Sequence, residues 1–127
     1  MYWQLLRQSS NVRMANSYAE MVVALWRDWQ RLGESNRERP IYLIELGAGS
    51  GRFAYHFLQR LTTLCEQAVI PLTDFCYVLT DVAEIILAFL AAHEGFRPFF
   101  ANGLLDVAHL DVNDATQLHL LKRDELL

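Results

Sequence analysis

Hydrophobic side chains recur at three- and four-residue intervals in the first part of the chain. From Ala15 to Leu32 this spacing is that of an amphipathic α-helix with one buried face. Gly33 follows at the position where a glycine commonly ends a helix. The next stretch, 34–40, is polar and closes with a proline, which predicts a linker. Residues 1–33 are therefore expected to form an N-terminal helical segment.

After the linker the pattern changes to short apolar runs that are bounded by turn-forming residues. Their near-continuous hydrophobicity is typical of strands that are covered on both faces in a parallel sheet. These runs are Ile41–Leu46, Cys76–Thr80 and Leu104–Leu110. Two segments with helical spacing separate them, Arg52–Cys65 and Ala83–His93.

Strands that alternate with helices predict right-handed crossovers and a parallel sheet. The expected fold class is therefore α/β. We expect a Rossmann-like sheet in 41–127, truncated to about three strands in the order 3-2-1, with flanking helices and the N-terminal helix. The tail Asp114–Leu127 is expected to be helical.

Composition excludes several classes of function. The chain has 127 residues, of which 53% are hydrophobic and 20% are charged, and its net charge is −4. These values predict a packed core and no basic face for nucleic acid. The longest apolar run, Val82–Ala92, contains Glu84 and is too short to span a bilayer. With no segment of signal-peptide type, and with Cys65 and Cys76 expected to be reduced, a cytoplasmic protein without a membrane partner is expected.

The most informative stretch is Glu45-Leu46-Gly47-Ala48-Gly49-Ser50-Gly51, at the end of the first predicted strand. Glycines at these spacings allow a sharp turn from strand to helix and a close approach of the backbone to a ligand. An acidic residue two places before a G-x-G-x-G turn resembles the signature of class I S-adenosylmethionine-dependent methyltransferases. The resemblance covers about residues 41–114, and its motifs become less specific toward the end of that range.

The resemblance implies a cofactor, S-adenosyl-L-methionine, and a set of residues that bind it. Glu45 and the turn would surround the methionine end, Asp81 would accept the ribose hydroxyls, and Asp111 with the backbone N–H of Val112 would meet adenine. The predicted cofactor-binding residues are Glu45, Gly47, Ala48, Gly49, Gly51, Asp81, Asp111 and Val112.

Some of these roles have local alternatives. Asp81 is also placed to cap the following helix, and Glu84 is a weaker candidate for the ribose hydroxyls. Asp114 would meet adenine in place of Asp111 if the predicted strand Leu104–Leu110 ended three residues later. Either acid is also consistent with a solvated loop.

Two other functions remain open. A dinucleotide-binding oxidoreductase fragment would use a similar turn, but NAD presents an anionic pyrophosphate, which Glu45 would repel. Arg52, which stands where the dinucleotide fingerprint has its third glycine, is the one feature that favours an anion. The third possibility is a non-catalytic interaction module that kept the fold and lost the activity.

No residue is predicted to act as general acid, base or nucleophile. The histidines show no metal-ligand spacing, and Ser50 lacks the G-x-S-x-G context of a nucleophile elbow. Methyl transfer needs little from such groups, because the cofactor supplies the reactive group and the protein orients it. The catalytic residues and the methyl acceptor therefore stay unknown, and no metal is expected.

The resemblance also implies that the chain carries the cofactor-binding half of the domain and lacks the half that selects a substrate. Its activity as a complete enzyme is therefore in question. Without a fourth strand beside it, Ile41–Leu46 is expected to be an exposed edge with uncovered apolar side chains. Self-association through this edge, or poor folding, is the expected consequence.

Overall fold

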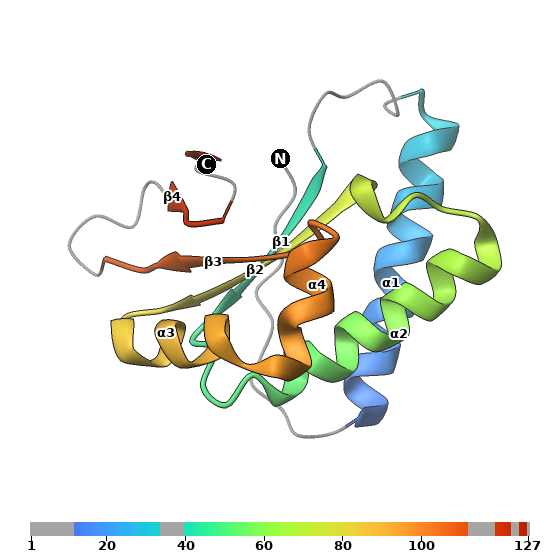
Figure 1. Ribbon diagram of the computed structural model, residues 1–127. Helices are drawn as coiled ribbons and strands as arrows, with labels where there is room; N and C mark the ends of the chain where they lie inside the picture. Colours follow the sequence, from blue (N-terminus) through green and yellow to red (C-terminus); the bar gives the residue numbers. More distant parts are fainter. Residues whose placement is uncertain (1–11, 34–39, 112–118, 123–124, 127) are drawn as a thin grey trace.

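The computed structural model describes residues 12–33, 40–111, 119–122 and 125–126. Helices and strands alternate along it, with a short 3-10 turn before β2 and another before α4 (Figure 1). The elements are α1 Val12–Arg31, β1 Ile41–Leu46, α2 Arg52–Ala68, η1 Leu72–Asp74, β2 Phe75–Asp81, α3 Glu84–Ala92, η2 Glu94–Phe96, α4 Arg97–Ala101, β3 Leu105–His109, β4 His119–Leu120 and β5 Glu125–Leu126.

The three long strands form one parallel sheet in the order β1-β2-β3. The predicted α/β class, the strand order and the N-terminal helix are confirmed. Leu46 pairs with Thr80 and Thr80 with Ala108, so the three strands end side by side. Residues that follow these strands are therefore brought to one edge of the sheet.

The helices cover one face of the sheet, where most of the core lies (Figure 1). Ile41 and Leu43 of β1 point into this helical layer, whereas Tyr42 and Ile44 point to the opposite face. α1 packs along α2 and is tied to the turn before β2, because the indole N–H of Trp26 donates a 2.8 Å hydrogen bond to a carboxylate oxygen of Asp74.

The opposite face carries a smaller cluster, completed by a residue from the end of the chain. Leu120 of β4 is buried there with residues from all three parallel strands, namely Tyr42, Ile44, Cys76, Val78 and Ala108. The backbone N–H of Leu121 donates to the carbonyl of Val107, and that of Lys122 donates to the buried carboxylate of Asp106. The segment around β4 is thus fastened to β3.

Two expectations are corrected by this arrangement. The described part of the tail is not helical, because β4 and β5 form a short antiparallel pair. The side chains of β1 are mostly covered, since residues from Ile41 to Glu45 are all buried and Leu46 is 42% exposed. The cover comes from the helical layer on one face and from the cluster around Leu120 on the other.

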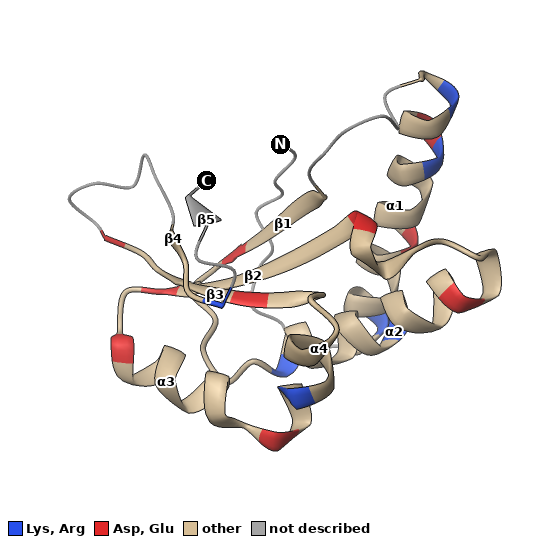
Figure 2. Ribbon diagram, turned by 45° about the horizontal axis from the view of Figure 1, so that its top comes forward, with Lys and Arg blue, Asp and Glu red and all other residues tan. Residues whose placement is uncertain are grey.

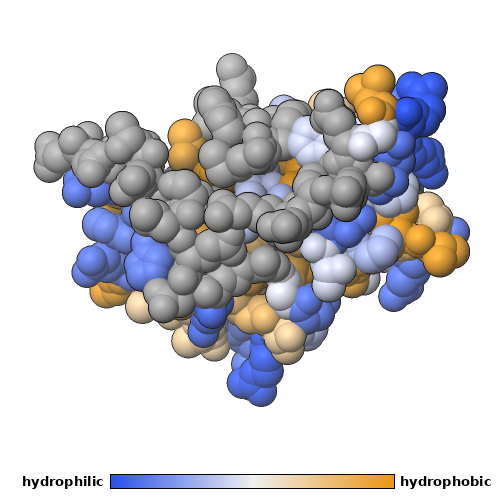
Figure 3. Space-filling view, turned by 90° about the horizontal axis from the view of Figure 1, so that it is seen from above, coloured by the Kyte–Doolittle hydropathy of each residue, from blue (hydrophilic) through white to orange (hydrophobic). Residues whose placement is uncertain are grey.

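Large hydrophobic side chains that remain exposed are spread over several elements. They include Met21 of α1, Val69 after α2, and Ile85 and Phe89 of α3. Hydrophobic and hydrophilic residues alternate over the described part of the face in Figure 3. None of the helices in the described ranges combines the length and the apolar character needed to cross a membrane. Cys65 and Cys76 are buried free thiols, as expected.

Self-association through β1 stays a prediction. β1 lies at the edge of the parallel sheet and pairs with β2. Edge strands offer a template for a second strand, so we expect an oligomer in analytical ultracentrifugation at tens of micromolar. A folded protein that sediments as a monomer over this range would contradict the expectation.

Candidate functional site

The glycine-rich turn connects the end of β1 to the start of α2, as the sequence predicts. Gly47, Gly49 and Gly51 have φ angles of 77°, 55° and 77°, in the left-handed region that favours glycine. The Ala48 N–H donates to the Thr80 carbonyl at 2.8 Å and so extends the pairing with β2. The Gly51 N–H then donates to the Ala48 carbonyl at 3.0 Å, which closes the turn before the helix.

The third glycine has a packing role that the sequence did not reveal. A Cβ at Gly51 would lie 2.8 Å from Leu90 Cδ2 and 2.9 Å from Phe96 Cζ. Gly51 is itself buried, whereas Gly47 and Gly49 are partly exposed. Close packing against α3 and η2 therefore explains this glycine, and the first two glycines are the ones left near solvent.

Asp81 ends β2 next to this turn and is almost completely buried. Its Oδ2 accepts a long 3.4 Å hydrogen bond from the Gly49 N–H, and its Oδ1 accepts a 3.0 Å bond from the Ala83 N–H. The second bond fixes the residue that precedes α3, which is close to the capping role considered as an alternative. The first bond links the carboxylate to the predicted cofactor turn.

Glu45, the acid of the motif, is fully buried on the helix-facing side of β1. Its Oε1 accepts a 2.5 Å hydrogen bond from the hydroxyl of Tyr77, and its backbone carbonyl accepts one of 2.6 Å from the hydroxyl of Thr80. Its Oε2 has no hydrogen-bond partner. In the described part of the chain, the only other buried side-chain polar atom without a partner is Nε of Arg60.

Burial dominates the ionisation of this carboxyl group. It raises the pKa of Glu45 to about 7, although the hydrogen bond from Tyr77 acts in the opposite direction. The pKa of Tyr77 is raised well above its usual value by burial and by the neighbouring carboxylate. Near neutral pH the pair therefore exchanges its proton at Glu45 and not at Tyr77.

The structure brings most of the predicted residues to one edge of the sheet. Glu45, the turn and Asp81 lie together at the ends of β1 and β2. Asp111 is exposed and lies two residues beyond the end of β3. Val112 and Asp114 lie outside the described residues. Glu84 is exposed in the first turn of α3.

Sequence reasoning missed two side chains at this edge. Tyr77 was read as a core strand residue, and only the register of β1 against β2 reveals its contact with Glu45. His109 ends β3 opposite Asp81, and its Nε2 lies 2.9 Å from the Val82 carbonyl oxygen. The position of His109 at the end of a predicted strand was the available signal.

The charges along the sheet are of one sign. β1, β2 and β3 contain acidic residues and no lysine or arginine (Figure 2). The Gly49 N–H, which a pyrophosphate would need, is directed at a carboxylate. Arg52 is exposed at the start of α2. This edge therefore suits a cation better than an anion.

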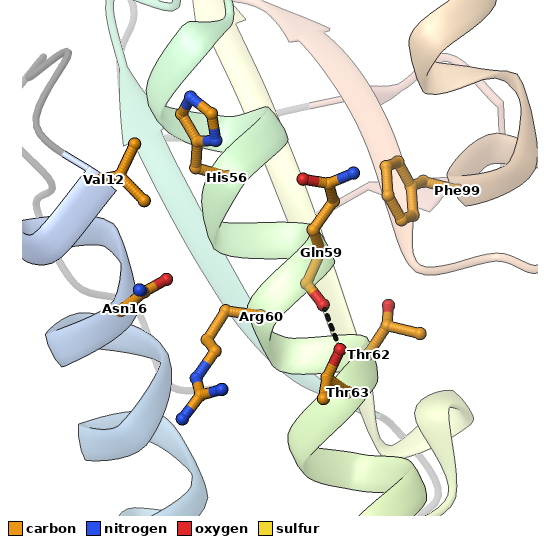
Figure 4. Close-up of a pocket in the computed structure, with 8 residues that line it drawn as sticks. All are labelled: Val12, Asn16, His56, Gln59, Arg60, Thr62, Thr63 and Phe99. Atoms are coloured by element: carbon orange, nitrogen blue, oxygen red, sulfur yellow. Dashed lines mark hydrogen bonds between the residues drawn. The ribbon is translucent and has the colours of Figure 1, made fainter.

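A groove lies away from the sheet edge, over the outer surface of α2. This groove of about 500 Å³ runs between the start of α1 and α4, with His56 and Arg60 toward α1 and Gln59 toward Phe99 (Figure 4). Arg60 makes a 3.3 Å ion pair with Glu20. No metal-binding group of histidine, cysteine, aspartate and glutamate occurs among the described residues.

Comparisons with known proteins add no family assignment. The sequence matches no protein-family model, and no curated protein or solved structure is significantly similar to it.

The stability cost of the close packing at Gly51 can be measured by comparison with Gly33, which has no such neighbours. Gly51→Ala adds a Cβ at positive φ against two buried side chains, whereas Gly33→Ala adds one at φ 74° with no atom within 4 Å. Backbone strain alone costs roughly 1–2 kcal/mol, and overpacking adds about 1–3 kcal/mol. Urea unfolding should show the larger loss for Gly51→Ala, and equal losses would contradict the packing role.

The buried carboxyl group predicts how stability depends on pH. Because burial raises its pKa in the folded protein to about 7, above the usual 4.5, its contribution to stability is full below pH 4.5 and is lost as pH rises through 7. The loss is on the order of 3 kcal/mol. Unfolding free energies at pH 5 and pH 8 should therefore differ less in Glu45→Gln than in the unmodified protein. The same pH dependence in both proteins would exclude Glu45 as its source.

Proposed function

We propose that this chain binds S-adenosyl-L-methionine and forms the cofactor-binding part of a methyltransferase that acts on an unknown acceptor. The observation that carries the proposal is the glycine turn at the end of β1, flanked by two carboxylates from neighbouring strands. Glu45 and Asp81 stand on either side of Gly47–Gly49 at one edge of a parallel sheet. In open α/β sheets, ligands bind outside this edge.

The charge of the cofactor fits these groups. S-adenosylmethionine carries a sulfonium and an ammonium group, with one carboxylate to balance them. Glu45 Oε2 is a buried acceptor without a partner, and an ammonium N–H that reached it on binding would satisfy it. Asp81 is the residue we assign to the ribose hydroxyls, in addition to its hydrogen bonds with Gly49 and Ala83. We assign adenine to Asp111 and Val112.

The chemistry requires little beyond binding. The bound cofactor would supply an electrophilic methyl group, and the residues of this chain would hold and orient it. His109, at the end of β3, pairs with Asp81 in the strand register. The buried free thiols are consistent with a cytoplasmic enzyme.

Calorimetry with three ligands tests the proposal. We expect S-adenosylmethionine and S-adenosylhomocysteine to bind, because both carry the ammonium and the ribose, and NAD not to bind. Binding of NAD alone would support the oxidoreductase alternative. Absence of binding by all three would support a non-catalytic module.

Removing the charge of Glu45 tests whether this residue contributes to cofactor binding. Glu45→Gln should weaken S-adenosylmethionine binding about tenfold or more, since a hydrogen bond to a charged group contributes about 1.5–3 kcal/mol. Glu66→Gln removes an exposed acid from the far end of α2 and should leave the affinity unchanged. Equal affinities for all three proteins would remove Glu45 from the site.

A further inference from the structure

The hydrogen bond between Tyr77 and Glu45 is built from two fully buried side chains on adjacent strands. The ring of Tyr77 packs against Phe57 of α2 with centroids 5.1 Å apart, so the position of its hydroxyl is fixed by the core. That hydroxyl contacts Oε1 alone, at 2.5 Å. The other oxygen, Oε2, is left without a donor.

A purely structural role explains this arrangement poorly. A buried polar atom without a hydrogen bond costs about 1–3 kcal/mol, and apolar side chains of similar volume usually serve a core equally well. The carboxylate lies two residues before Gly47, at the edge of the sheet where the turn and Asp81 meet. A donor on a ligand at this edge would remove the cost.

We propose that Tyr77 is a positioning residue for the cofactor: it occupies Oε1 of Glu45, leaves Oε2 to the ammonium group, and couples binding of the cation to release of the Glu45 proton. This inference rests on the proposed function. Below pH 7 the ligand-free Glu45 mostly holds its proton, and on binding this proton passes to solvent. No covalent bond of the ligand changes.

Among the described residues, Tyr77 is the side chain that hydrogen-bonds to the carboxyl group of Glu45. The buried faces of α1 and α2 next to this side of the sheet are apolar, apart from Cys65 at the far end of α2. On β2, Leu79 pairs with Glu45, and Asp81 lies two residues further on, held by Gly49 and Ala83. The Tyr77 hydroxyl is thus the hydrogen-bond donor that favours the ionised carboxylate.

The coupling gives binding a distinct pH profile. Since the pKa of Glu45 is about 7, a cation that needs the ionised form binds progressively more weakly below pH 7. The loss approaches about tenfold for each pH unit. At pH 6, binding should release close to one proton.

Calorimetry of S-adenosylmethionine binding in buffers with different ionisation heats counts these protons directly. Tyr77→Phe removes the hydroxyl and keeps the ring, so the pH midpoint of binding should rise by about one unit and the affinity at pH 7 should fall about fivefold to tenfold. Thr80→Val is the matched control, because it removes a buried hydroxyl that donates to the Glu45 backbone carbonyl and not to its carboxylate. It should leave the midpoint unchanged.

These experiments distinguish failure of the Tyr77 role from failure of cofactor binding itself. No binding by the unmodified protein at any pH would overturn both. Binding without proton release at pH 6 would overturn the inference and leave the proposed function standing, and this measurement needs no variant. Equal midpoints in Tyr77→Phe and Thr80→Val would also overturn it. A carboxyl NMR titration of ligand-free Tyr77→Phe should show a higher Glu45 pKa, and an unchanged value would count against the role of Tyr77.

Discussion

The parallel alignment of three strand ends is the constraint on which the rest of this structure depends. Because β1, β2 and β3 run in the same direction with matched register, the residues that follow them share one edge. The left-handed glycines let the chain reverse there into α2. Two buried carboxylates, those of Glu45 and Asp81, thereby lie next to the turn.

The fold was predictable because its signals are local. Short apolar runs, helical periodicity and glycine positions each depend on neighbouring residues, and together they gave the sheet order and the boundaries of α1 and α2 to within a few residues. The short helix α4, Arg97–Ala101, is not among the predicted elements. It contains Pro98 in its first turn, where proline is well tolerated.

The features that the sequence did not predict depend on contacts between distant segments. The tail contains apolar residues at spacings that suit a helix, but Leu120 completes a cluster on the far face of the sheet, and the chain around it bonds to β3. Burial of β1 follows from the same packing. Likewise, the partner of Glu45 is set by strand register across 32 residues, which no local pattern encodes.

The glycines of the turn serve two purposes, close packing and a backbone that stays near solvent. Gly51 is explained by packing against Leu90 and Phe96, whereas Gly47 and Gly49 remain partly exposed beside the carboxylates. The most direct test of cofactor binding is therefore a ¹⁵N NMR titration with S-adenosylmethionine. The account predicts saturable shifts of the Gly47 and Gly49 amides and none in the middle of α1, and a turn whose amides do not respond would contradict it.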